Sequence, residues 1–246
     1  MNEKKIKFKF YSEEFFNKEA ANNNYIVKVI YGFIYPLSYI FYKLKLTPNT
    51  LTWLSILSCA FGCYGLFIEN IKLFILFWSL SILFDFCDGT VARMSNNLRK
   101  NLLRFDHYSD LCKFSAVILS IALYYETSYY WIFSFVCSFM YLFYTILDHD
   151  VVHQIIKVRL NNKNQKRGSK LRDNFKIIRF ITANNFLFSF VKLFMPFFII
   201  NGHTLIIFLF MPLSINFAYF GLLYLIILTF IGINLRLGLL RSALKI

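Results

Sequence analysis

Long apolar blocks alternate with short polar or basic connectors along this chain, which is the pattern of an all-α polytopic membrane protein. Each block approaches or exceeds the ~20 residues with which a helix crosses a bilayer. The pattern therefore predicts six transmembrane helices, with Pro212 kinking or splitting the last one. The predicted spans are residues 47–68, 73–93, 105–124, 129–147, 183–200 and 205–234, the last two separated by Asn201, Gly202 and His203.

A different pattern precedes the first span. Tyrosines recur at helical spacing from Tyr31 to Tyr42 within residues 25–44, a segment that also carries lysines. We expect this segment to lie on the membrane as an interfacial amphipathic helix, although a weakly apolar spanning helix is an alternative. Thr47 and Pro48 fit the N-cap and first turn of the first span. The predicted parts are an N-terminal segment with the interfacial helix (1–46), a six-helix membrane domain (47–240) and a cytoplasmic tail (241–246).

The chain carries 27 Lys and Arg against 13 Asp and Glu, a formal net charge of +14. Such a charge often signals nucleic-acid binding. Here the basic residues fall between the apolar blocks, and residues 157–179 hold nine of them against the single acid Asp173, as cytoplasmic loops do. We therefore expect membrane lipids rather than nucleic acid as partners, and an integral protein of the inner or cell membrane. An even number of spans places both termini, including Arg236, Arg241 and Lys245, on the cytoplasmic side.

Four carboxylates interrupt the apolar pattern where the second span ends and the third begins. Asp85 and Asp88 lie three residues apart and Asp106 and Asp110 four apart, so each pair shares one helix face. A charge at membrane depth costs at least ~2.5–3.5 kcal/mol, so such acids normally face a polar cavity. Mg²⁺ prefers carboxylate oxygens and retains water for phosphate ligands. We predict a metal site between the two helices; the alternative is that the acids are hydrated helix ends.

Small and basic residues accompany these acids. Gly89 lacks the side chain that would keep a ligand from the backbone, Ala92 lies on the acid face, and Arg93 offers a planar fork for phosphate. One turn beyond the last acid, Lys113 could reach a phosphate on an acceptor or could be a lysine that snorkels from the membrane edge. His107 turns about 100° away from the acid face and is interpreted as a packing or interfacial residue.

Together these residues resemble the signature of the CDP-alcohol phosphotransferase (CDP-alcohol phosphatidyltransferase) family. The matching pattern is Asp85-x2-Asp88-Gly89-x2-Ala92-Arg93 and, after eight further residues, Leu102-x3-Asp106-x3-Asp110. Seven of its eight fixed positions match, and the departure is Leu102, where the family has a second glycine. The resemblance also includes the six spans, the interfacial helix and the Thr-Pro-Asn start at residues 47–49.

The resemblance implies transfer of a phosphoalcohol or phosphatidyl group from a CDP-activated donor to an acceptor alcohol, with release of CMP, in phospholipid or related lipid biosynthesis. Asp85, Asp88, Asp106 and Asp110 would hold Mg²⁺ or Mn²⁺, as two ions, and Asp110 would also take the proton from the attacking hydroxyl. The CDP site would be lined by Gly89, Ala92, Arg93 and Asn49. The donor would be CDP-diacylglycerol or a CDP-linked small alcohol, and family members often form homodimers.

Two other functions fit parts of the pattern. An intramembrane prenyltransferase also binds Mg²⁺ and a diphosphate through two acid-rich motifs, but those motifs lie far apart, and Gly89, Ala92 and Arg93 have no role there. A non-enzymatic alternative is a cation-dependent transporter or a catalytically degenerate family member that acts as a binding or scaffold protein, which Leu102 keeps open. Release of CMP separates the transferase from both.

Overall fold

The computed structural model describes residues 6–15, 25–96, 102–147 and 202–244. All regular secondary structure in these ranges is helical, as the hydrophobic pattern predicts. The elements are α2 (Tyr25–Lys43), α3 (Pro48–Phe67), α4 (Ile71–Met94), α5 (Leu102–Tyr125), α6 (Ser128–Ile146), α11 (Gly202–Phe210), the 3-10 turn η2 (Met211–Leu213) and α12 (Ile215–Leu244). The chain forms two compact units, Met1–Phe135 with Asn201–Gly221 and Val136–Ile200 with Leu222–Ile246.

Three helices in the described part of the chain are long and apolar enough to cross a membrane: Pro48–Phe67, Ser128–Ile146 and Ile215–Gly238. Helices α4 and α5 have 24 residues each, which corresponds to ~36 Å and exceeds the ~30 Å of a hydrocarbon core. Both carry acids near one end. The predicted span 183–200 and the basic loop 157–179 lie outside the described residues, so the count of six spans stays a prediction.

The last predicted span, residues 205–234, is split into two helices, which is one of the two outcomes expected at Pro212. Helix α11 ends at Phe210, a 3-10 turn follows, and Ser214 is extended before α12 begins. Pro212 explains the break, because its ring has no N–H to donate and clashes with the carbonyl four residues earlier. Ser214 then starts the next helix, since its hydroxyl accepts a hydrogen bond from the Phe217 amide at 3.2 Å. The expected separator residues Gly202 and His203 lie within α11.

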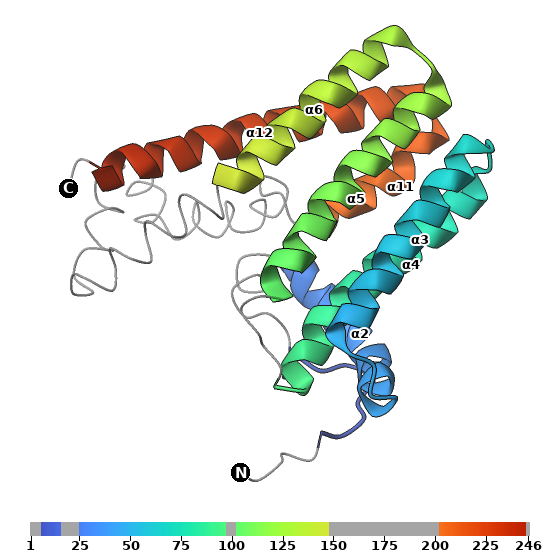
Figure 1. The fold of residues 1–246 in the computed structure, drawn as a ribbon, viewed down its shortest axis with the longest axis vertical. Coiled ribbons are helices and arrows are strands. Elements are labelled where there is room, and N and C mark those ends of the chain that lie inside the picture. Colours follow the sequence, from blue (N-terminus) through green and yellow to red (C-terminus); the bar gives the residue numbers. More distant parts are fainter. Residues whose placement is uncertain (1–5, 16–24, 97–101, 148–201, 245–246) are drawn as a thin grey trace, which may run out of the picture. The chain divides into compact units, whose positions relative to one another are not determined.

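Helix α2 confirms that the tyrosine-rich segment is helical, and it packs against α4 (Figure 1). Tyr35 is buried, and its hydroxyl donates a 2.7 Å hydrogen bond to the carbonyl of Lys7. The Tyr31 ring meets Phe86 of α4 edge to face at 5.0 Å. The opposite face exposes apolar side chains, including Phe33 at 70%. This two-sided character agrees with an interfacial helix, although the location at the membrane surface stays a prediction.

Helices α3 and α4 form an antiparallel hairpin (Figure 1). Their turn is a Schellman motif, in which the Asn70 amide donates to Gly65 and the Glu69 amide donates to Leu66. Glu69 occupies the left-handed position of this motif with φ 58°. The Asn70 side chain then caps α4 by accepting from the Leu73 amide at 3.1 Å. The hydrogen-bonding groups at the end of α3 and at the start of α4 thus find partners within three residues. This short turn places α4 directly alongside α3.

The helices pack through small residues and aromatic rings. A Cβ on Gly65 would lie 2.9 Å from the backbone nitrogen of Phe74, so only glycine allows this approach of α3 to α4. Trp78 of α4 and Phe114 of α5 both meet the Phe208 ring of α11 edge to face, at 5.7 and 5.1 Å. All three rings are almost fully buried. The aromatic cluster therefore joins α4, α5 and α11 close to the acid-bearing turns.

The second unit is held by a separate contact between α6 and α12. The Arg236 guanidinium lies over the Tyr144 ring at 5.8 Å from its centroid. Gly232 lies one turn earlier, and a Cβ there would come within 2.6 Å of the same ring. The two helices approach each other at this point because glycine leaves room for the tyrosine.

Candidate active site

The antiparallel pairing of α3 and α4 brings polar side chains of two apolar helices into register. The Thr52 hydroxyl donates to Asp88 Oδ2 at 2.7 Å, and the Ser55 hydroxyl donates to the Ser81 carbonyl at 2.9 Å. Thr52 and Ser55 are three residues apart on α3, and their partners lie on the facing side of α4. The three hydroxyl-bearing residues are almost completely buried, so this polar strip lies inside the helix pair.

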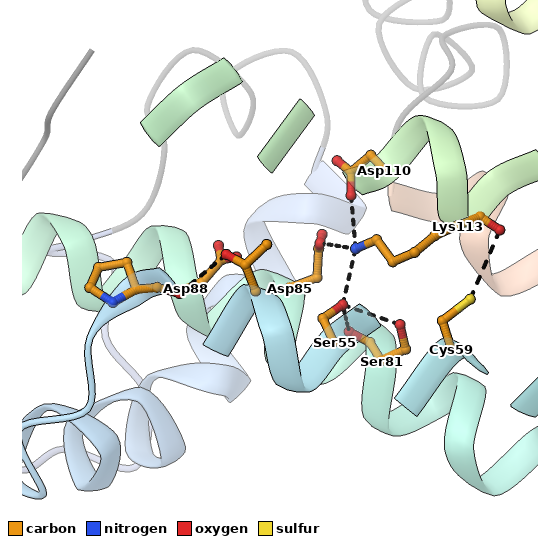
Figure 2. A network of polar contacts seen from close by, with 9 residues as sticks. Ser55, Cys59, Ser81, Asp85, Asp88, Asp110 and Lys113 are labelled. Atoms are coloured by element: carbon orange, nitrogen blue, oxygen red, sulfur yellow. Dashed lines mark hydrogen bonds and ion pairs between the residues drawn. The ribbon is translucent and has the colours of Figure 1, made fainter. Parts of the chain in front are cut away.

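Lys113 of α5 is at the centre of the network (Figure 2). Its ammonium forms ion pairs with Asp85 of α4 and, at 2.8 Å, with Asp110 of its own helix, and it donates to the Ser55 hydroxyl at 3.0 Å. The residue is only 6% exposed. An ammonium group has three N–H donors, and these three acceptors match them. One buried cation thus joins α3, α4 and α5.

The acids differ in their exposure. Asp88 is 4% exposed and is held by Thr52, whereas the Asp85 side chain is 18% exposed and that of Asp110 is 43% exposed. Asp106 lies on α5, one helical turn before Asp110, but its side chain lies outside the described residues. The structure therefore brings Asp85 and Asp110 to a common cation and places Asp88 one turn further along α4.

The donor chemistry of this cluster fits a hard divalent cation. Asp85 and Asp110 already share a positive charge, the Lys113 ammonium, which stands where a cation between the two helices would stand. Carboxylate oxygens are the protein ligands that Mg²⁺ prefers. Among the side chains that the structure describes, no three of His, Cys, Asp and Glu gather closely enough to hold a metal ion. A metal site here would therefore have to include Asp106, whose side chain lies outside the described residues.

Arg93 lies one turn beyond the acids and is fixed from three sides. Its Nε donates to the carbonyl of Phe15, its Nη2 donates to the Thr90 hydroxyl at 3.3 Å, and its guanidinium lies over the Tyr31 ring at 5.3 Å. Burial raises the pKa of the Tyr31 phenol, while the positive charge of Arg93 opposes that rise. A Cβ on Gly89 would lie 3.3 Å from Arg93 Nη1. Gly89 thus makes room for this guanidinium, a role that its sequence position did not reveal.

Ala92 and Asn49 are the other residues predicted to line the nucleotide site, and they are less closely connected to Arg93 and the acids. Ala92 is half-buried on α4, next to Arg93. Asn49 is exposed in the first turn of α3, and the described residues include no hydrogen bond from it to the acids. The structure therefore groups Gly89 with Arg93 and leaves Asn49 apart from this group.

Two cavities border Lys113. The smaller one, about 10 Å³, is lined by Trp78, Ser81, Ile82, Asp85, Asp110 and Lys113, and is about the size of one water molecule. The larger one, about 540 Å³, opens between α3 and α5. It is mostly apolar and is lined by Ile56, Cys59, Ala60, Cys63, Phe105, Tyr108, Ser109, Cys112, Lys113 and Ala116. Lys113 is the charged residue in the lining of the larger cavity and links it to the acids.

Sequence reasoning missed the supporting hydroxyls and left two interpretations of Lys113 open. Thr52, Ser55 and Ser81 carry no motif, although a polar residue repeated at helical spacing inside an apolar run is a signal that could have been used. The interpretation of Lys113 as a snorkelling lysine is wrong, because its ammonium is buried among two carboxylates and a serine hydroxyl. Contact between Lys113 and a phosphate of the acceptor stays a prediction.

Comparison with known families agrees with this geometry. The sequence model described as CDP-alcohol phosphatidyltransferase matches residues 45–232, which include every helix that contributes to the acidic cluster. The chain therefore belongs to the CDP-alcohol phosphatidyltransferase family, whose members are membrane transferases of phosphate-containing groups in lipid biosynthesis. No curated protein and no solved structure matches the chain.

Proposed function

We propose that this protein transfers a phosphoalcohol or phosphatidyl group from a CDP-activated donor to an acceptor alcohol and releases CMP. The observation that carries the proposal is the shared ion pairing of Asp85 and Asp110 with Lys113. These two acids come from the two halves of the family signature, on α4 and α5, and the fold joins them around one positive charge. Carboxylates that converge from two helices are suited to hold a divalent cation next to a diphosphate.

Asp85, Asp88, Asp106 and Asp110 are the residues that would hold two Mg²⁺ or Mn²⁺ ions. When bound, such ions neutralise the diphosphate and stabilise the leaving CMP. The protein contributes the orientation of these carboxylates. Thr52 fixes one oxygen of Asp88 through its 2.7 Å hydrogen bond, and the helical geometry of α4 sets the spacing between Asp85 and Asp88.

Asp110 is proposed as the base. Its side chain is the most exposed of the three acids whose side chains are described, so an acceptor hydroxyl can approach it. The acceptor oxygen forms a bond to the phosphorus that carries the donor alcohol while Asp110 accepts the hydroxyl proton. The bond from that phosphorus to the oxygen of CMP breaks, and CMP leaves with the electron pair. A positioned base of this kind typically contributes 10²–10⁴-fold to a rate.

Arg93 is proposed to bind a phosphate of the CDP moiety, with Gly89, Ala92 and Asn49 lining the nucleotide site. A guanidinium presents a rigid set of donors that matches phosphate oxygens. Its acceptors in the structure are the main-chain carbonyl of Phe15 and the Thr90 hydroxyl, which are neutral oxygens and so weaker partners than a phosphate. Substrate can therefore compete for this group.

The proposal includes an orientation and a product class. The acid-bearing ends of α4 and α5 would face the cytoplasm of the inner or cell membrane, on the side of the basic loop and both termini. The donor would be CDP-diacylglycerol with a small polar acceptor, or a CDP-linked small alcohol with a lipid acceptor. A homodimer is the expected assembly. The alternative of a prenyltransferase predicts no CMP.

The experiment is Mg²⁺-dependent release of CMP by purified protein in detergent, with each donor class offered alongside a panel of acceptors. Asp110→Asn is expected to reduce CMP release at least ~10²-fold. Glu69→Gln is the matched control, because Glu69 is an exposed acid in the α3–α4 turn. If folded wild-type protein releases no CMP with any pairing, the transferase proposal fails and the non-catalytic family member becomes the better interpretation.

A further inference from the structure

We propose that Lys113 is a resident counter-ion that competes with the divalent cation for Asp85 and Asp110 and is displaced when that cation binds. This inference rests on the proposed function only in that it assigns a metal to the same carboxylates. Lys113 thereby becomes a positioning residue that sets the metal affinity of the site. Neither the snorkelling nor the acceptor-binding interpretation of this lysine includes such a role.

The first support is the completeness of the pairing. The Lys113 ammonium has Asp85, Asp110 and Ser55 as acceptors, and its side chain is 7% exposed. Two carboxylates from two helices would repel each other without a cation between them. A lysine is expensive to bury without partners, so this arrangement exists because the acids and the ammonium neutralise one another. Without a metal ion, the Lys113 ammonium therefore supplies the positive charge that holds Asp85 and Asp110 together.

The second support is that the ammonium and a metal ion would bind the same two carboxylates, Asp85 and Asp110. Mg²⁺ binds carboxylate oxygen at ~2.0–2.1 Å, while Lys113 Nζ lies 2.8 Å from Asp110 Oδ1. The two cations cannot share these oxygen atoms without strong mutual repulsion at such short range. Binding of the ion and pairing of Lys113 therefore oppose each other, and each weakens the other reciprocally.

The third support is that the side chain has somewhere to go. Lys113 lines the small cavity with Asp85 and Asp110 and also the cavity of about 540 Å³ between α3 and α5. Its four-carbon stem has several rotatable bonds, so the ammonium can turn from the first space into the second without movement of the helix. The larger cavity therefore offers space into which a change of side-chain rotamer would carry the ammonium.

The test measures Mn²⁺ binding to the purified full chain in detergent, from the magnetic resonance signal of free Mn²⁺, with no substrate present. Lys113→Met is expected to bind Mn²⁺ at least ~10-fold more tightly than wild type. Without metal this variant should unfold at a lower temperature than wild type. Saturating Mn²⁺ should reduce or reverse this difference in unfolding temperature. The matched control is Lys72→Met, an exposed lysine at the start of α4, which should leave the affinity unchanged.

Ser55→Ala keeps the experiment decisive if Lys113→Met fails to fold. It removes one acceptor from the ammonium and alters no acid, so the affinity for Mn²⁺ should rise by a smaller factor, ~2–5-fold. Unchanged or weaker binding in the folded variants would overturn the inference. Because the readout needs no turnover, a protein that binds Mn²⁺ as expected but releases no CMP would refute the transferase proposal alone.

Discussion

The Thr52 hydroxyl donates a 2.7 Å hydrogen bond to Asp88 Oδ2 across 36 positions of the sequence, inside a pair of apolar helices. Both residues are less than 5% exposed. The same hydroxyl also lies 3.1 Å from the carbonyl of Pro48, one turn earlier on α3. Asp88 is therefore oriented by a residue of the first predicted span, and the start of α3 is part of the candidate active site.

Replacing Thr52 by valine keeps the shape of the side chain and removes the hydroxyl. We expect the affinity for Mn²⁺ to fall by ~10–100-fold, the usual effect of losing a group that orients a metal ligand. Thr52→Ser should retain most of the affinity, because it keeps the donor. Binding of Mn²⁺ by Thr52→Val that equals wild type would show that this hydrogen bond does not orient Asp88.

Leu102 is the first residue of α5 and occupies the position of a family glycine. Leu102 lies between Arg93 and the acids of α5 in the sequence, and Leu102→Gly removes its side chain. We expect the KM for the CDP-linked donor to fall about fivefold, equivalent to ~1 kcal/mol of binding free energy. Steady-state CMP release at varied donor concentration measures this change. Leu102→Ala should give an intermediate value. An unchanged KM would mean that leucine is compatible with nucleotide binding here.

Gly65 and Gly62 allow a matched test of helix packing. A Cβ on Gly65 would approach a backbone nitrogen at 2.9 Å, whereas on Gly62 its nearest neighbour would lie at 3.4 Å. Gly65→Ala is expected to destabilise the protein by ~1–3 kcal/mol, because the Phe74 backbone nitrogen cannot rotate away from a new Cβ as a side-chain atom can. Gly62→Ala should be neutral or slightly stabilising, since alanine favours a helix by ~0.5–1 kcal/mol. Thermal unfolding in detergent compares the two variants.

Glu69 adopts φ 58° at the end of α3, a conformation that costs an L-residue ~1–2 kcal/mol relative to glycine. Glu69→Gly should therefore raise the free energy of unfolding by about 1 kcal/mol. Glu69→Ala tests the cause, because alanine has a Cβ and should give no comparable gain. A higher melting temperature for both variants would instead point to removal of the acidic charge as the cause.

The sequence alone determined most of the helices and the chemistry of the acids. Apolar blocks of spanning length predicted α3, α4, α5 and α6 to within a few residues, and Pro212 marked the break between α11 and α12. The spacing of Asp85 and Asp88 placed them on one face of α4. These features depend on local geometry, namely the helical period, capping and the missing amide of proline, and each can be read from neighbouring residues.

Only the tertiary structure decided which side chains support those acids. Lys113 and Ser55 are separated by 58 positions, and Thr52 and Asp88 by 36, so no local pattern connects them. The contact of Thr52 with Asp88 arises because Gly65 lets α3 approach α4 and because the Schellman turn sets the register of these two helices. Lys113 reaches Ser55 because α5 packs against α3. A shift of one residue in that register would rotate each hydroxyl by about 100° away from its partner. The acids can therefore be identified from the local sequence, whereas the charges and hydrogen bonds around them depend on how the helices pack.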